Sequence, residues 1–142
     1  MADLSYHTEI QRERTLRLRE LQRELPSYCG EFFRGIEPTT TALTRLNYAY
    51  DLRLFFSYLT EEVPGFQGRA IPEITLADLE TITPTILERY LEYLGYYVSQ
   101  DDRELENHNP GKARKLSTLK SFFKYLYKRE LLSQNVAAKV DM

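Results

Sequence analysis

The chain has 142 residues, 42% of them hydrophobic and 28% charged, and a net charge of −2, which predicts one folded domain and excludes a mainly disordered chain. One cysteine and two histidines exclude an internal disulfide and are too few for a zinc cluster, so we expect no metal and no cofactor. Because the chain lacks both an apolar signal core and a run of ~18 apolar residues, we expect a cytoplasmic protein without a membrane partner. We also expect no small-molecule substrate.

Helical patterns follow one another through the first half of the chain. Residues 8–25 are rich in Arg, Glu and Leu, with acids and bases three or four apart, which is typical of a solvated helix. Pro26 ends this helix and opens a short one that stops near Gly35. Residues 39–59 predict the longest strong helix, with threonines as N-caps and apolar residues on nearly every side, which indicates a buried position in a bundle.

The second half begins with a loop and continues with helices. Residues 64–74 contain two Gly and two Pro and predict a loop. Thr75 and Thr83 are predicted N-caps, the second of a helix over 84–98 that has proline in its first position. A polar, acidic loop is predicted over 99–109. No alternating strand pattern of useful length is present, so the predicted fold class is all-α.

Residues 109–130 stand out because seven Lys and Arg occur there with only one acid. The Asn-Pro pair at 109–110 is predicted to open a helix, and Ser133 or Asn135 to begin a last turn. The net charge divides unevenly along the chain. Residues 61–106 hold three bases and eleven acids, whereas residues 107–142 hold eight bases and two acids. This asymmetry points to an anionic partner for the basic end.

A helical wheel of residues 112–129 separates an apolar side from a cationic one. The predicted core side consists of Leu116, Leu119, Phe122, Phe123, Leu126 and Tyr127. The opposite side mixes bases with hydroxyls: Arg114, Ser117, Thr118, Lys120, Ser121, Lys124 and Lys128. Long cationic arms would neutralise phosphates and short hydroxyls would donate hydrogen bonds to them, while Lys112 and Lys115 flank the free N–H groups of the helix N-terminus.

A merely hydrated helix face is the alternative interpretation of these charges. Solvated helices usually mix Glu with Lys, as residues 8–25 do, but Glu130 is the only acid of the basic stretch and comes at its end. Like charges four residues apart also destabilise a helix by a few tenths of a kcal/mol per pair. The absence of acids therefore favours a polyanion such as nucleic acid.

Two stretches resemble the N-terminal core-binding domain of tyrosine recombinases, the phage-integrase family. In the first stretch, the residues that match the family pattern in type and spacing are Thr44, Tyr48, Asp51, Leu52, Phe55, Tyr58 and Leu59. The second stretch resembles the other hallmark helix of that domain. The matching residues are Leu116, Ser117, Thr118, Leu119, Lys120, Phe122, Phe123, Tyr125 and Leu126. Residues 74–94, between them, resemble the middle helices of the family, so that the resemblance covers about residues 26–138.

The resemblance implies a SAM-like fold, a compact bundle of four main helices, with an extra N-terminal helix over residues 1–25. It implies a core-binding domain over 26–138 and the start of a linker over 139–142. Double-stranded DNA and other recombinase protomers are the implied partners. The implied DNA-binding residues are Thr41, Thr44, Arg45, Lys112, Arg114, Lys115, Ser117, Thr118, Lys120, Ser121 and Lys124.

The chemistry of the resembled family belongs to a downstream catalytic domain that this chain does not contain, so no catalytic residue is predicted here. Tyrosines such as Tyr48, Tyr90, Tyr93 and Tyr125 recur at helical spacing with Leu and Phe, which indicates core packing. This fragment is therefore expected to bind DNA for a strand-transfer enzyme without being an enzyme itself. The alternative function is a helical protein–protein docking module, in which acidic and basic surfaces associate.

Overall fold

The computed structural model of the protein describes residues 2–99 and 101–142 and confirms the all-α class. The α-helices of these residues are α1 (Ala2–Arg23), α2 (Tyr28–Ile36), α3 (Ala42–Glu62), α4 (Leu76–Leu79), α5 (Pro84–Tyr93) and α6 (Asn109–Lys128). Short 3₁₀ turns are η1 (Glu37–Thr39), η2 (Ile71–Glu73) and η3 (Val136–Lys139). The chain forms two compact units, which divide between Ile74 and Thr75.

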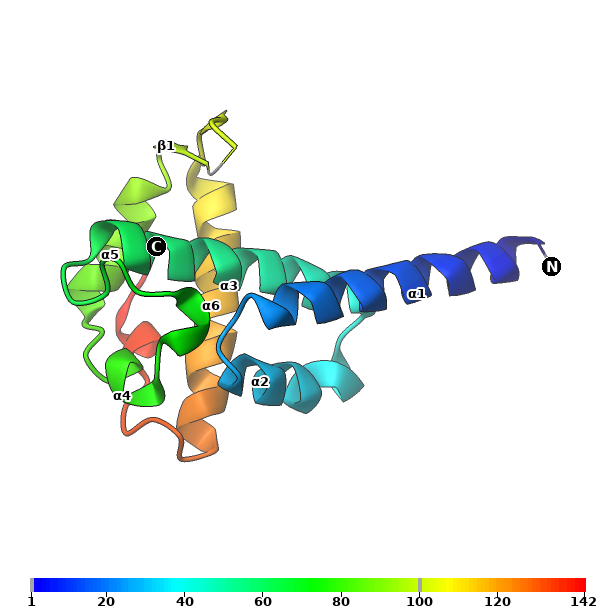
Figure 1. Cartoon of the computed structure of the whole chain (residues 1–142), viewed down its shortest axis with the longest axis horizontal. Helices are drawn as coiled ribbons and strands as arrows, with labels where there is room; N and C mark the ends of the chain where they lie inside the picture. Colours follow the sequence, from blue (N-terminus) through cyan, green and yellow to red (C-terminus); the bar gives the residue numbers. More distant parts are fainter. Residues whose placement is uncertain (1, 100) are drawn as a thin grey trace. The chain divides into compact units, whose positions relative to one another are not determined.

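The first unit is organised by the packing of α1 along α3, which Figure 1 shows side by side. Leu18, Leu21 and Leu25 are buried, whereas Tyr6, in the first turns of α1, is 64% exposed. Figure 1 shows these first turns (blue) continuing past the start of α3. The helix begins at Ala2, six residues before its predicted start, and the added stretch contains neither proline nor glycine to interrupt it.

A polar cluster on the surface also joins α1 to α3. The Nε atom of Arg17 donates to the Tyr50 hydroxyl at 2.9 Å, and the guanidinium groups of Arg17 and Arg53 lie 5.6 and 5.3 Å from the centre of the Tyr50 ring. Arg53 pairs with Glu24 at 3.2 Å. Because these pairs are exposed, each adds little stability, and the buried leucines carry most of the packing energy.

In the second unit, the predicted caps form as expected. The Thr75 hydroxyl accepts from the Asp78 N–H at 3.1 Å and the Asp78 carboxylate accepts from the Thr75 N–H at 2.8 Å, which completes a capping box before α4. The Thr83 hydroxyl accepts from the Ile86 N–H at 3.3 Å at the start of α5. The predicted last turn is confirmed as η3, which packs against α5 and α6.

The predicted helix over 84–98 is wrong at its C-terminal end. Helix α5 ends at Tyr93, and an antiparallel hairpin follows, in which β1 (Tyr97–Val98) pairs with β2 (Glu104–Leu105). The Tyr97 ring stacks on the Tyr93 ring with centroids 5.2 Å apart. The hairpin also replaces part of the predicted loop over 99–109. With only two residues in each strand, it gave no alternating pattern to detect.

Helix α6 ends in a Schellman motif built on a residue other than glycine. Glu130 has a φ of 62°, its N–H donates to the Tyr127 carbonyl at 3.0 Å, and the Leu131 N–H donates to the Leu126 carbonyl at 2.9 Å. This left-handed conformation disfavours a residue with a Cβ by about 1 kcal/mol. A glutamate therefore occupies a position where glycine would be more stable.

Glu80 joins the segment after α4 to the segment after α6. The Ser133 hydroxyl and the Ser133 N–H, the latter at 2.7 Å, both donate to the Glu80 carboxylate. These two hydrogen bonds hold the pKa of the Glu80 carboxyl below its ordinary value, because they stabilise the charged form. The stabilisation is therefore fully present above the unfolded pKa and is lost as the pH falls through the folded pKa.

We expect the variant Glu80→Gln to unfold more easily than the wild type at pH 7, and the difference between them to shrink at an acidic pH below the folded pKa of the Glu80 carboxyl, where the wild-type carboxyl is protonated. Thermal unfolding at the two pH values measures this difference. The control Glu88→Gln removes an exposed charge from α5 without touching Ser133. A gap between wild type and Glu80→Gln that is the same at both pH values would contradict the assigned role of these hydrogen bonds.

Candidate nucleic-acid interface

Helix α6 has one deeply buried side and one exposed side. Leu119 is 1% exposed, and Phe122, Phe123 and Leu126 are fully buried. The exposed side is the cationic face, which we define as Arg114, Ser117, Lys120, Ser121, Lys124 and Lys128. Within it, Lys120 and Ser121 are half-buried and the other side chains are exposed. Since the members recur at intervals of three or four residues, they form a continuous surface along the helix.

Two residues of α6 differ from the predicted wheel. Thr118 was expected on the cationic side, but it is fully buried, and its hydroxyl lies 3.5 Å from the Arg114 carbonyl oxygen. Tyr127 was expected in the core, but it is 48% exposed. Both positions lie near the boundary between the two sides, where a wheel cannot decide burial. Thr118 is therefore excluded from the cationic face.

The described part of the protein does not neutralise the lysines of the cationic face. Within the described residues, no carboxylate forms an ion pair with Lys120, Lys124 or Lys128. Two ion pairs of the described residues, Arg17–Glu20 and Arg53–Glu24, involve α1 and α3. The surface consequently keeps its positive charge in solution, where a polyanion can neutralise it.

Lys115 and Lys112, at the start of α6, lie next to the end of α5. The Lys115 ammonium donates to the Asn107 side-chain oxygen at 3.2 Å, and the Asn107 amide donates to the Leu94 carbonyl at 3.1 Å. The Nζ atom of Lys112 lies beside Gly95, just after α5. The negative end of the α5 dipole favours cations at this point. Both lysines therefore help to position α6, in addition to any contact with a ligand.

Asn107 is a positioning residue that the sequence alone did not reveal. A Cβ on Gly111 would lie 2.9 Å from the Asn107 side-chain oxygen, so the first turn of α6 admits Asn107 only because Gly111 has no side chain. The Gly111 in an otherwise helical stretch was a signal of a close approach. The start of α6 is also one residue earlier than predicted, with His108 at the N-cap and Asn109 inside the helix.

The predicted DNA-binding residues of α3 act first as capping groups. The Thr41 hydroxyl accepts from the Thr44 N–H at 3.1 Å and donates to the Thr44 hydroxyl, also at 3.1 Å. Arg45 donates to the Thr40 carbonyl at 2.7 Å and to the Glu37 carbonyl at 3.2 Å. Thr41 remains exposed, and Thr44 and Arg45 are half-buried. They belong to the first unit, whereas α6 belongs to the second.

The described part of the chain gives little support for a reactive thiol, a metal site or a membrane-spanning helix. Cys29 is buried, and its burial raises the pKa of the thiol far above the ordinary value, which makes it unreactive. No three His, Cys, Asp or Glu side chains of these residues gather closely enough to hold a metal ion. None of the described helices is both long enough and apolar enough to cross a membrane.

The described residues thus define a small all-α protein in which α6 carries a basic face. The chain is 32% identical over 99 residues to the tyrosine recombinase XerC of Caldanaerobacter subterraneus subsp. tengcongensis. This match covers 66% of the chain, which spans only 27% of the relative's length. No family model matches the chain, and no solved structure matches it. The matched region is a tyrosine recombinase domain, which confirms the family predicted from the two helical motifs.

Proposed function

We propose that this chain is the core-binding module of a site-specific tyrosine recombinase or integrase. In this proposal the cationic face of α6 binds the phosphates of duplex DNA at the recombination site, and a separate catalytic domain carries out strand exchange. The chain supplies DNA binding and no catalytic side chain. Residues 26–138 form the module, and residues 1–25 are a helical extension.

The observation that carries the proposal is the unneutralised charge of Lys120, Lys124 and Lys128 on the surface of α6. A helix that kept these lysines only for solubility would be more stable with acids between them. Ser117 and Ser121 lie among the bases and are short enough to let a phosphate backbone approach. Lys112, Arg114 and Lys115, near the helix N-terminus, extend the positive surface toward its free N–H groups.

The start of α3 is the second proposed contact. Exposed Thr41 has a hydroxyl that can turn toward a phosphate, and Arg45 retains guanidinium N–H groups beyond the one nitrogen that donates to the chain. Thr44 lies between them. These residues would position the DNA backbone without reading its sequence.

We expect this fragment to bind duplex DNA weakly and in a salt-dependent manner. If four or five phosphates are contacted, the logarithm of the binding constant should fall with the logarithm of the salt concentration at a slope of roughly −4. Fluorescence anisotropy of a labelled duplex, titrated at several salt concentrations, measures this slope. A slope near zero, or no binding at the lowest salt concentration, would contradict the proposed function.

A further inference from the structure

Helix α1 carries its acids and most of its exposed bases on separate sides. On a helical wheel, Glu9, Glu13 and Glu20 lie together on one side, and the buried Leu18 and Leu21 define a second side. A third side has bases and hydroxyls but no acid among the described side chains. We call it the arginine flank and define it as Thr8, Arg12, Thr15, Arg19 and Arg23.

The stability of α1 alone does not explain this separation of charges. Arg19 and Arg23 are four residues apart, and like charges at that spacing destabilise a helix. Arg17 and Glu20 show the stabilising arrangement, an ion pair of 2.9 Å between residues three apart. Within the described residues, Arg12, Arg19 and Arg23 form no ion pair. The arginine flank therefore keeps its positive charge in solution.

The arginine flank is shaped to receive a small anionic group. A surface hollow of about 400 Å³ lies on it, and its lining includes Thr8, Arg12, Thr15, Leu16 and Arg19. Arg12 and Arg19 are exposed before and after Thr15 along the helix. Long guanidinium arms can thus bind an oxyanion from two sides, while the short threonine hydroxyls let it approach the helix and donate hydrogen bonds to it.

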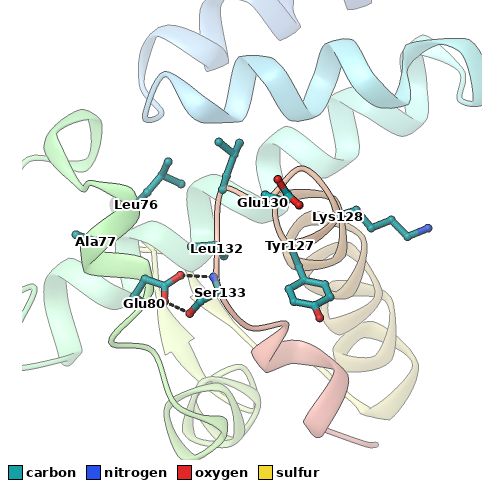
Figure 2. Close-up of a pocket in the computed structure, with 9 residues that line it drawn as sticks. Leu76, Ala77, Glu80, Tyr127, Lys128, Glu130, Leu132 and Ser133 are labelled. Atoms are coloured by element: carbon teal, nitrogen blue, oxygen red, sulfur yellow. Dashed lines mark hydrogen bonds between the residues drawn. The ribbon is translucent and has the colours of Figure 1, made fainter.

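The cationic face of α6, in the second unit, has the same composition. There too, exposed bases alternate with short hydroxyls, and the acids lie elsewhere. Figure 2 shows the Lys128 side chain directed away from Glu80 and Glu130, and the Glu80 carboxylate turned toward Ser133. Helices of both units therefore present the same pattern, which favours the same class of ligand for both.

We propose that the arginine flank of α1 is a further DNA contact, in which Arg12 and Arg19 bind phosphates of the duplex backbone. The inference rests on the proposed function and adds a contact made by the N-terminal extension. Arg12 and Arg19 are seven residues apart, which is about 10 Å along the helix, so their flexible arms reach separate phosphates. Thr8 and Thr15 donate to phosphate oxygens between them. Such contacts strengthen binding to any duplex without reading its sequence.

Anisotropy titrations of the full chain with a labelled duplex at several salt concentrations test the inference. Arg12→Glu with Arg19→Glu should lower the affinity at low salt at least about tenfold and make the salt slope shallower by about 2. Arg12→Lys with Arg19→Lys should keep the slope, because lysine retains the charge. The control Arg34→Glu with Arg89→Glu reverses two exposed bases of α2 and α5 and should bind like the wild type.

The outcomes separate this inference from the proposed function. Undiminished binding by a folded Arg12→Glu, Arg19→Glu variant would overturn the inference alone, and the arginine flank would then suit an acidic protein surface rather than DNA. An equal loss in the control variant would also overturn it, because the net charge and not its position would be responsible. Absence of duplex binding by the wild type would refute the proposed function, and the inference with it. Circular dichroism verifies that each variant is folded.

Discussion

The double variant Lys120→Glu with Lys124→Glu is expected to lose duplex binding while it keeps its helical fold. Both lysines lie on the cationic face, and neither is paired with a carboxylate of the described residues. Each reversal removes one phosphate contact and adds one repulsion. Affinity at low salt should fall on the order of 100-fold, and the salt slope should become shallower by about 2. Anisotropy titrations, with circular dichroism to verify the fold, measure both.

A matched control separates the position of the charges from the total charge. Arg103→Glu with Lys139→Glu changes the net charge equally, but Arg103 lies in the hairpin segment and Lys139 in η3. This control should bind DNA nearly as well as the wild type. The neutral pair Lys120→Gln with Lys124→Gln should give an intermediate affinity. Normal binding by a folded reversal variant would exclude the cationic face as the DNA contact.

The helices that the sequence predicted well are those whose caps and breakers act locally. Thr75 and Thr83 form their caps with residues three positions away, so a short window contains all the relevant information. The unpaired state of the lysines in α6 was also anticipated, because the acids are missing from the local sequence. The recombinase motifs were recognisable for a related reason, because each motif consists of residues spaced along a single helix.

The features that the sequence missed depend on contacts between distant segments. The hairpin requires Tyr97 to face Leu105 across a turn, and a strand of two residues has no period to detect. The bond between Glu80 and Ser133 joins residues 53 positions apart. Asn107 reaches back to the Leu94 carbonyl and forward to Lys115. Burial at the edge of a helix face, as at Thr118, is likewise decided by neighbouring elements rather than by the helix period.

The rotation of α6 about its own axis decides which of its residues can meet DNA, and two aromatic residues test it. Phe122 is fully buried, whereas Tyr127 is 48% exposed. Phe122→Ala would leave a cavity and should lower the free energy of unfolding by about 3–5 kcal/mol. Tyr127→Ala removes an exposed ring, and we expect a change within about 0.5 kcal/mol. Urea unfolding followed by circular dichroism measures both values.

The ratio of these two effects matters more than either value, because the apolar pattern of the sequence alone places both residues in the core. Equal destabilisation by the two substitutions would mean that α6 is turned so that Tyr127 packs inside. Lys120 and Lys124 would then lie at the boundary between the buried and the exposed side of α6, and the cationic face would have to be redefined. A large effect of Phe122→Ala with a small effect of Tyr127→Ala instead fixes the outward direction of the lysines on which the proposed DNA contact depends.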